Sequence, residues 1–257
     1  MDNIAGEPTV VGIYSFPKSG NTWMRAILGN AIERPDGKSG LDSIPDIYTT
    51  PIWNTPVDIV GRKTVLYKSH GKNEANTANG RDFVNDLVIY VQRHPLDVFL
   101  SHLNFVSANV TKNPHIMLPC DSVEIVIERG ELDLYFGAFC VFGTLQPQFA
   151  DAGSWFTNAE NWHARAVADP NRVMIVRYED MVQHGPDSLS AIAAKIGLTH
   201  AQIENGFKRA GAETRADGKF FWKQKAGHFR EVLSQAMIDR FFDIYAGRIA
   251  PLGYVND

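Results

Sequence analysis

The sequence predicts a single α/β domain in which a parallel β-sheet carries helices on both faces. Four short runs are rich in β-branched and aromatic residues, which is typical of buried strands; they cover residues 10–14, 64–67, 87–91 and 173–176. Helical signals follow three of these runs, and strands that alternate with helices are typical of a parallel sheet. The length of 257 residues fits one large domain of this class.

The predicted helices begin at residues that favour a helix start. The first begins near Asn21 and the second near Pro95, because proline is favoured at the first helical position. Two more are predicted over residues 186–196 and over residues 154–167, and the latter leads into the fourth strand. Strands and helices therefore follow one another along the chain.

One domain is expected over residues 1–257, with loop-rich insertions near 34–62, 104–153 and 208–230. Four prolines break the first insertion, and the second contains an aromatic-rich run, a pattern that is more often core than binding surface. The third holds seven basic and two acidic side chains among three glycines. Such a run is usually a solvated face, and a lid that closes over an anion is the competing interpretation.

Composition limits the possible partners. The net charge of −4 argues against a protein that coats nucleic acid, so any anion site must be local. Cys120 and Cys140 stand twenty residues apart, a spacing that suggests neither a disulfide framework nor a zinc cluster. No signal peptide is visible, and no apolar run reaches the roughly 20 residues that span a bilayer. These features predict a cytoplasmic protein without a membrane span, and they leave a homo-oligomer open.

Polar and basic residues follow each predicted strand. The four strand ends read PKSGNTW, KSH, QRHP and RYEDM. In open parallel sheets, ligands bind outside the carboxyl ends of the strands, so these residues should meet at one edge. Three of the ends present a basic side chain, from Lys18, Lys68 and Arg93. Three cationic ends on an acidic protein predict a polyanionic ligand.

The loop after the first strand resembles a phosphate-binding P-loop in its chemistry. A strand that runs through a glycine turn into a helix directs free backbone N–H groups and the positive helix end at an anion. Gly20 permits the turn, and Ser19, Asn21 and Thr22 add donors. A Walker A lysine follows the second glycine, whereas Lys18 precedes the only glycine, so an ordinary ATPase is excluded. A plain turn with a solvated lysine remains the alternative.

His70 ends the second strand and is a candidate general base. An imidazole has a pKa of about 6.5 and can accept a proton at neutral pH, and a base at a strand end would face the ligand. A lone histidine is more often structural. The chain contains eight, and none has the spacing of a metal site.

Arg93 and Ser101 are candidates for binding a phosphate monoester. They stand eight residues apart, with Arg93 at the third strand end and Ser101 on the following predicted helix. The planar guanidinium pairs with two oxygens and the hydroxyl with a third. A salt bridge from Arg93 to Asp97 or Glu179 is an equally open alternative.

Taken together, these residues resemble the sulfotransferases that use 3′-phosphoadenosine-5′-phosphosulfate (PAPS), in the order of that family and over most of the chain. PKSGNTW at 17–23 resembles the family's 5′-phosphosulfate loop, usually PKSGTTW. Residues 65–70 resemble the segment with the family's catalytic histidine. Residues 88–101 match its 3′-phosphate motif, with an arginine and a serine eight apart. GSW at 153–155 and VRYEDM at 176–181 are also similar.

The resemblance implies transfer of the sulfuryl group from PAPS to a hydroxyl, with a sulfate ester and 3′-phosphoadenosine 5′-phosphate (PAP) as products. It implies that His70 is the general base and that Lys18 and Lys68 neutralise the phosphosulfate, without a metal. The implied cofactor-binding residues are Lys18, Ser19, Gly20, Asn21, Thr22, Trp23, Arg93, Ser101, Tyr178, Lys223, Lys225 and Gly227. Trp23 would stack on adenine, and a core tryptophan is the alternative.

Two departures from the family pattern bear on these roles. Asn21 replaces the first threonine of the loop. The C-terminal element, normally Arg-Lys-Gly-x-x-Gly-Asp-Trp, reads WKQKAGHF here, so that only Lys223 and Gly227 match and Lys225 and Arg230 are candidates. This weak match, with the missing anchor, indicates a soluble bacterial branch. The expected acceptor is a hydroxyl or phenol on a small, partly apolar molecule.

Two other functions are weaker alternatives. A nucleotide-dependent phosphotransferase or kinase should carry a lysine after the loop glycine and a magnesium-binding aspartate at a strand end, and neither is in place. A catalytically idle PAP-binding protein should lack a base, whereas His70 is present.

Overall fold

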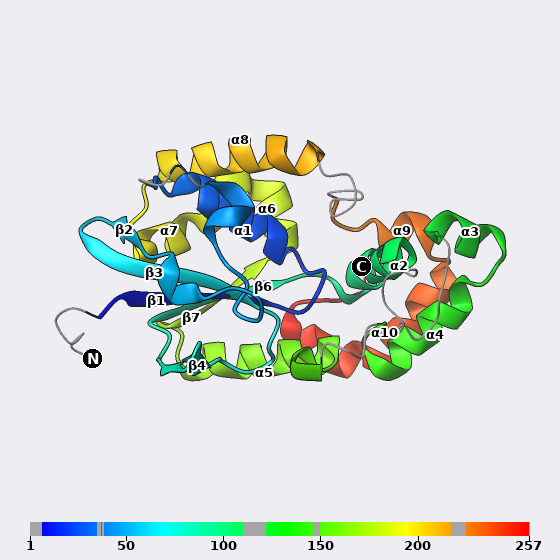
Figure 1. The fold of residues 1–257 in the computed structure, drawn as a ribbon. Coiled ribbons are helices and arrows are strands. Elements are labelled where there is room, and N and C mark those ends of the chain that lie inside the picture. The colour runs from blue at the N-terminus through cyan, green and yellow to red at the C-terminus, as the bar shows by residue number, and fades with distance from the viewer. Residues whose placement is uncertain are drawn as a thin grey trace.

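A five-stranded sheet forms the centre of the structure, which is a computed structural model (Figure 1). It describes residues 7–34, 37, 39–109, 122–145, 150–216 and 225–256. The strands lie in the order β2-β3-β1-β6-β7, and β1 is central. Their bounds are β1 (Thr9–Ser15), β2 (Val57–Ile59), β3 (Arg62–Ser69), β6 (Leu87–Gln92) and β7 (Val173–Arg177); β4 (Thr77–Ala78) and β5 (Arg81–Asp82) form a separate hairpin.

The four predicted strands are all present, as β1, β3, β6 and β7, and they pair in parallel. The expected α/β class with a parallel sheet is therefore confirmed. Strand β2 was not predicted. It is three residues long and pairs antiparallel with β3 at the edge, so the sheet is mostly rather than wholly parallel.

Helices cover both faces of the sheet, as expected (Figure 1). One face carries α1 (Asn21–Ala31), α6 (Tyr178–His184), α7 (Ser190–Ile196) and α8 (His200–Ala216), and the other carries α5 (Trp155–Ala168). Successive strand residues point to opposite faces. Val11 and Ile13 accordingly share a core with α1, whereas Val10 and Tyr14 share one with Trp162 of α5.

A third group of helices packs beyond the carboxyl ends of the strands (Figure 1). It consists of α2 (Pro95–Asn109), α3 (Val123–Glu128), α4 (Leu132–Phe142), α9 (Phe229–Val232) and α10 (Gln235–Ile249). Phe99, Phe136, Phe139 and Phe241 are fully buried in its core. The aromatic-rich run is thus mainly core. Short 3₁₀ turns complete the fold: η1 (Gly40–Ser43), η2 (Ile52–Asn54), η3 (Ala150–Ala152), η4 (Gly185–Leu189) and η5 (Ala250–Leu252).

Two of the expected loop-rich insertions are more helical than the sequence suggested. Residues 104–153 contain the end of α2 together with α3 and α4. Residues 208–216 form the second half of α8, where the Glu213 carboxylate accepts from Asn30 Nδ2 at 2.9 Å and from Leu41 N at 3.3 Å. This half of the basic segment is therefore docked on α1. Lys223 lies outside the described residues.

Candidate active site

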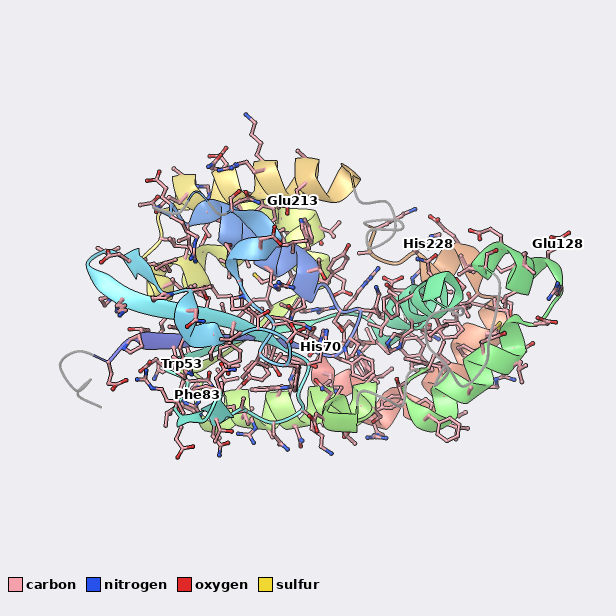
Figure 2. All side chains as sticks on the ribbon, in the orientation of Figure 1. Trp53, His70, Phe83, Glu128, Glu213 and His228 are labelled. Atoms are coloured by element: carbon pink, nitrogen blue, oxygen red, sulfur yellow. The ribbon has the colours of Figure 1, made fainter. Side chains whose placement is uncertain are left out.

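The strand order brings the predicted strand-end residues to one edge of the sheet. Strand β1 lies between β3 and β6, and β7 follows β6, so Lys18, His70, Arg93 and Tyr178 leave neighbouring strands at the same end. Figure 2 shows His70 at this edge, between the sheet and the helices beyond it. The strand order is therefore compatible with the predicted single polyanion site at this edge.

The loop between β1 and α1 depends on a glycine at one position. Gly20 has φ +110°, in the left-handed region, and a Cβ added there would lie 2.6 Å from Cδ2 of Tyr178. An alanine would therefore be strained by its backbone and would collide with the ring. Lys18 also has a positive φ, of 71°, and Ser19 N donates to Phe16 O at 3.2 Å. The loop is a tight, specific turn.

The N-terminal end of α1 leaves polar groups for a ligand. Gly20 at the N-cap provides no side-chain cap, and no acidic residue stands in the first turn. Ser19 Oγ is buried and has no hydrogen-bond partner within the described part of the chain. Buried polar atoms normally have partners, and helix N-termini attract anions. An anion at this loop would satisfy these groups.

Asn21 makes a contact with β1 that the sequence analysis did not predict. Its Nδ2 donates to Ile13 O of β1 at 3.1 Å, and the side chain is buried. Its Oδ1 has no partner among residues that the structure describes. The amide donor of Asn21 therefore braces the loop against the strand, whereas Thr22, which is half-buried, stands at the helix start.

Lys18 lies half-buried beside an aromatic ring. Its Nζ is 4.5 Å from the centre of the Phe105 ring of α2. Burial, assisted by the charge of Arg93, lowers the pKa of Lys18 to about 8. An anion bound nearby would favour the charged form and raise this pKa again.

His70 is held as a neutral base of defined tautomer. Its Nδ1 lies 2.9 Å from Ser15 O, and a carbonyl oxygen can only accept, so Nδ1 carries the proton and Nε2 keeps the lone pair. Burial, followed by the charges of Lys68 and Lys18, lowers the pKa of His70 to about 3. Asn158 Nδ2 donates to His70 O at 3.3 Å, which fixes the backbone from α5.

Lys68 is paired with a carboxylate that the sequence analysis did not assign to the site. Its Nζ lies 2.5 Å from Oδ2 of Asp46 in the proline-rich loop. Burial lowers the pKa of Lys68, and Asp46 opposes that effect. The Lys68 ammonium, which the sequence analysis expects to neutralise the phosphosulfate together with Lys18, is thus also paired with Asp46.

Arg93 connects three parts of the site. Its guanidinium carbon lies 4.3 Å from the centre of the Tyr178 ring. Its Nη1 donates to Lys18 O at 3.4 Å and its Nη2 to Lys225 O at 3.1 Å. Its Nε is buried and lacks a partner in the described structure. The guanidinium therefore keeps capacity for an anion.

The alternative salt bridges of Arg93 are not formed. Asp97 instead accepts from Gly227 N at 2.7 Å and from Phe229 N at 3.0 Å. Glu179 accepts from His94 N at 2.8 Å. Asp97 thus ties the C-terminal segment to α2 and places the backbone of Gly227 beside the site, a role that its position in the first turn of α2 did not reveal.

The remaining predicted site residues, Trp23, Ser101 and Lys225, have different surroundings. Trp23 is half-buried, with its ring centre 5.5 Å from that of Tyr178 and 5.7 Å from that of Phe207, so one aromatic cluster forms at the start of α1. Ser101 is half-buried on α2, and no contact in the described structure joins its hydroxyl to Arg93. The ammonium of Lys225 is exposed and pairs with Glu231.

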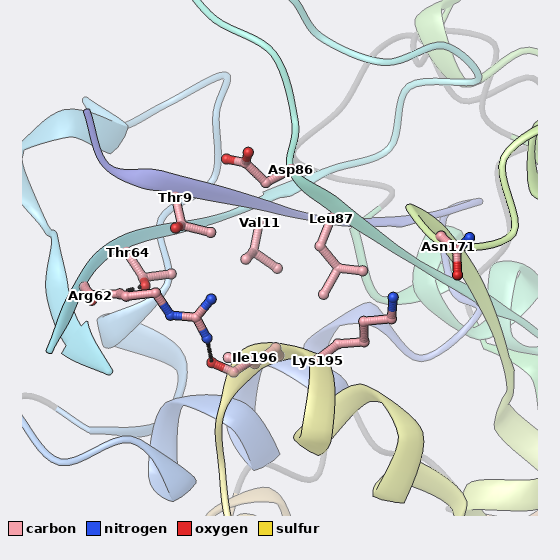
Figure 3. Close-up of a pocket in the computed structure, with 9 residues that line it drawn as sticks. All are labelled: Thr9, Val11, Arg62, Thr64, Asp86, Leu87, Asn171, Lys195 and Ile196. Atoms are coloured by element: carbon pink, nitrogen blue, oxygen red, sulfur yellow. Dashed lines mark hydrogen bonds between the residues drawn. The ribbon is translucent and has the colours of Figure 1, made fainter. Parts of the chain in front are cut away.

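A cavity of about 170 Å³ lies at the opposite end of the sheet (Figure 3). Thr9 and Leu87 line it from the amino ends of β1 and β6, and Lys195 and Ile196 line it from the end of α7. Arg62 donates from Nη2 to Ile196 O across its rim, at 3.4 Å. None of the predicted site residues lines this cavity, so it is separate from the candidate active site.

Two further findings concern metals and membranes. Within the residues that are described, no group of three His, Cys, Asp or Glu side chains could hold a metal ion. The same residues include no helix with the length and apolar character needed to cross a membrane.

Residues 83–253 match the family described as sulfotransferase domain. Cytosolic sulfotransferase 13 of Arabidopsis thaliana is 25% identical over 202 residues, which are 75% of this chain and 56% of that protein. Sulfotransferase 6B1 of Danio rerio is 24% identical over 262 residues, which are 93% of this chain and 77% of that protein. The chain thus spans little more than half the length of the plant relative.

Solved structures with bound PAP share the fold. Mouse sulfotransferase SULT7A1, complexed with PAP, superposes with a TM-score of 0.63 at 16% identity, over 95% of this chain and 84% of that one. Retinol dehydratase, in complex with androsterone and PAP, superposes with a TM-score of 0.52 at 17% identity, over 96% of this chain and 82% of that one. The resemblance seen in the sequence is confirmed: because the family match spans well over half of its length, the chain belongs to the sulfotransferase domain family.

Proposed function

We propose that this protein transfers the sulfuryl group of PAPS to a hydroxyl of a small molecule, with His70 as the general base. The observation that carries the proposal is the orientation of His70. Its Nδ1 is fixed by Ser15 O at the end of β1, so its basic Nε2 belongs to a neutral ring beside the anion-binding loop. Membership of the sulfotransferase domain family supports the reaction type.

The residues present fit a bound PAPS. Ser19 Oγ and Arg93 Nε are buried polar atoms for which the described chain offers no partner, and both are in the segments expected to hold phosphate groups. The loop amides, Ser19, Thr22 and Lys18 would hold the 5′-phosphosulfate. Trp23 would stack on adenine, and Tyr178, whose ring lies against Arg93, would be near the 3′-phosphate. The related mouse protein was crystallised with PAP, the product nucleotide.

The 3′-phosphate would be held by Arg93 and Ser101 together with the C-terminal segment. Arg93 offers a planar fork and contacts only carbonyl oxygens and the Tyr178 ring in the described structure. Gly227 is held beside α2 by Asp97, which supports its assignment to the site. Lys223 and Lys225 remain candidates by position.

Each catalytic side chain would have a distinct task. PAPS supplies an activated sulfuryl group on a phosphate leaving group. His70 Nε2 would accept the proton of the attacking hydroxyl, while Lys18, Lys68 and the loop N–H groups stabilise the negative charge that develops on the leaving oxygen. Because these cations can neutralise the phosphosulfate, we propose that the reaction needs no metal.

The acceptor is proposed to be a small, partly apolar alcohol or phenol. Tyr48 supports this, because the residue is 55% exposed while its hydroxyl lies 3.3 Å from Ser69 Oγ, next to His70. Retinol dehydratase, which shares the fold, was crystallised with androsterone. We also propose a cytoplasmic enzyme, in line with the named cytosolic relatives, and leave a homo-oligomer as a further possibility to measure.

Calorimetric titration with PAP, ATP and NAD in metal-free buffer tests the proposal. PAP should bind at least about tenfold more tightly than ATP, because the site holds cations for a 3′-phosphate. Tight ATP binding without PAP binding would favour the phosphotransferase and overturn the assignment. A screen of hydroxyl compounds with radiolabelled PAPS would then identify the acceptor class.

A further inference from the structure

The loop that carries Asp46 is built against the strand that carries Lys68. Lys68 N donates to Pro45 O at 2.8 Å, and Ile47 N donates to Lys68 O at 3.0 Å, so the backbone brackets the lysine on both sides. The side chains then meet, with Nζ 2.5 Å from Oδ2 of Asp46. Their exposed fractions are only 12% and 25%, which makes this a partly desolvated ion pair.

The position of the carboxylate does not depend on Lys68 alone. Arg25 of α1 donates from Nη2 to Ile44 O at 2.6 Å and to Leu41 O at 2.9 Å, which fixes the loop on its other side. Asp46 Oδ1 accepts from Tyr48 N at 3.1 Å. Both carboxylate oxygens are therefore engaged, and the loop presents Asp46 in a fixed orientation.

The contact with Asp46 affects the pKa values of both Lys68 and His70. Burial and the neighbouring Arg25 lower the pKa of Lys68, and Asp46 is the group that opposes them. Asp46 also raises the pKa of His70, two residues on, whereas the charge of Lys68 lowers it. An ammonium has three N–H donors, and Asp46 uses one of them. Among the residues that the structure describes, no other side chain or carbonyl accepts from this ammonium, so two donors are left for oxygens of a bound ligand.

We propose that Asp46 is a positioning residue for sulfuryl transfer: it holds the Lys68 ammonium, charged and oriented, beside His70 at the carboxyl end of β3. Asp46 itself contacts Lys68 and not the reacting atoms. This inference rests on the proposed function, because the catalytic task of Lys68 belongs to that function. It adds a residue that none of the predicted roles included.

The titration of Lys68 gives a test that needs no acceptor. Competitive labelling of the whole protein with acetic anhydride, read by peptide mass spectrometry across pH 7 to 11, reports the pKa of each lysine. Asp46→Asn should lower the pKa of Lys68 by about 1 to 3 units, the range typical of a close opposite charge. Asp46→Glu, which restores the carboxylate, should return most of the shift.

Asp42→Asn is the matched control, because it removes the same charge from an exposed position in the same loop. It should leave the Lys68 titration within about 0.3 units, as expected of a screened surface charge. If Asp46→Asn does not fold, Asp46→Ser keeps an acceptor for Tyr48 N and takes its place. An unchanged Lys68 titration in the folded variant overturns the inference.

Steady-state kinetics can show whether the positioning role of Asp46 fails while the proposed function of the protein holds. The pH profile of activity is measured with an acceptor from the screen. In Asp46→Asn, the alkaline fall in activity should begin at a lower pH than in the wild type, displaced by as many pH units as the pKa of Lys68. PAP affinity should change less than about threefold. Equal alkaline limbs in the two proteins would refute the positioning role even if PAP binds. Failure of the wild type to bind PAP would refute the proposed function, whatever the Lys68 titration shows.

Discussion

The two ends of the candidate site are built in different ways. At the proposed sulfuryl end, Lys18, Lys68 and His70 extend from the adjacent strands β1 and β3, and His70 is hydrogen-bonded to β1 through Ser15 O. At the nucleotide end, Arg93 and Tyr178 meet a C-terminal segment that arrives from a distant part of the chain and presents backbone groups.

Because the two ends are built differently, we expect turnover to depend mainly on the first end and nucleotide affinity mainly on the second. The proposed sulfuryl end is set by strand pairing, which positions the proposed base His70 and the candidate cations Lys18 and Lys68 next to one another. The nucleotide end depends on Asp97 holding Gly227 and Phe229, and therefore on how well α2 and the C-terminal segment stay together. Variants at the first end should reduce turnover, whereas variants at the second should reduce binding.

The largest effect is expected at the sulfuryl end. His70→Ala should reduce kcat by about 10² to 10⁴, the range for loss of a general base, with PAP affinity unchanged. Steady-state kinetics with labelled PAPS and calorimetry with PAP measure the two quantities. His200→Ala, which removes an exposed histidine paired with Asp187, is the control and should retain full activity. Normal turnover in His70→Ala would remove His70 from the mechanism.

The nucleotide end should show the opposite pattern. Arg93→Gln should weaken PAP binding by about 10 to 100-fold, since a charge-assisted hydrogen bond contributes about 1.5 to 3 kcal/mol. Binding of 5′-AMP, which lacks the 3′-phosphate, should change much less. Lys225→Gln is the comparison, and because that ammonium already pairs with Glu231 the loss should stay below about threefold. Equal losses for PAP and 5′-AMP in Arg93→Gln would contradict the assignment of Arg93 to the 3′-phosphate.

Gly20 lies where the two ends of the candidate site meet, because the loop between β1 and α1 packs against Tyr178 at this residue. Gly20→Ala should lower the free energy of unfolding by about 2 kcal/mol and weaken PAP binding, through left-handed strain and collision with the ring. Gly61→Ala is a matched control, since Gly61 also has positive φ, +72°, but no atom lies within 4 Å of an added Cβ. Chemical denaturation of both variants should show the smaller loss for Gly61→Ala. Equal losses would mean that the contact with Tyr178 is unimportant.

The remaining prediction concerns the pH dependence of stability, which depends on two buried histidines in the helical group beyond the sheet. Burial lowers the pKa of His94 and of His102 to about 3. Each native pKa is below the unfolded value of about 6.5, so the unfolded chain takes up protons first as the pH falls. Stability should therefore decrease from pH 6.5 toward pH 3, by up to about 1.4 kcal/mol per pH unit for each histidine.

His102→Gln should remove one of these contributions. Urea titrations at pH 7, 6 and 5 should show a shallower loss of stability in the variant than in the wild type. His200→Gln, at an exposed position, should keep the wild-type slope. Parallel slopes for all three proteins would show that His102 titrates normally and is hydrated.

Much of the site could be predicted because its residues stand at strand ends. Runs of β-branched residues identify β1, β3, β6 and β7 without knowledge of their partners, and the parallel topology then places Lys18, His70 and Arg93 at one edge. The tautomer of His70 could not be predicted, since it depends on the Ser15 carbonyl of a neighbouring strand.

Three other features could not be predicted from patterns in the sequence. Helix α4 is apolar on nearly every side, with Phe136 buried and Leu134 and Phe142 exposed, so helical periodicity is hidden. Strand β2 has only three residues. The ion pair of Lys68 with Asp46 depends on the path of an irregular loop, which local propensity does not determine.

The packing of Tyr178 against Gly20 has a consequence for synthesis on the ribosome. The loop at Gly20 emerges early, whereas the ring that closes over it is encoded beyond β6 and α5. Contacts of such long sequence separation form late in folding. A nascent chain that ends before β7 would therefore expose the loop without this ring, and the proposed nucleotide site would be complete only after Tyr178 has left the exit tunnel.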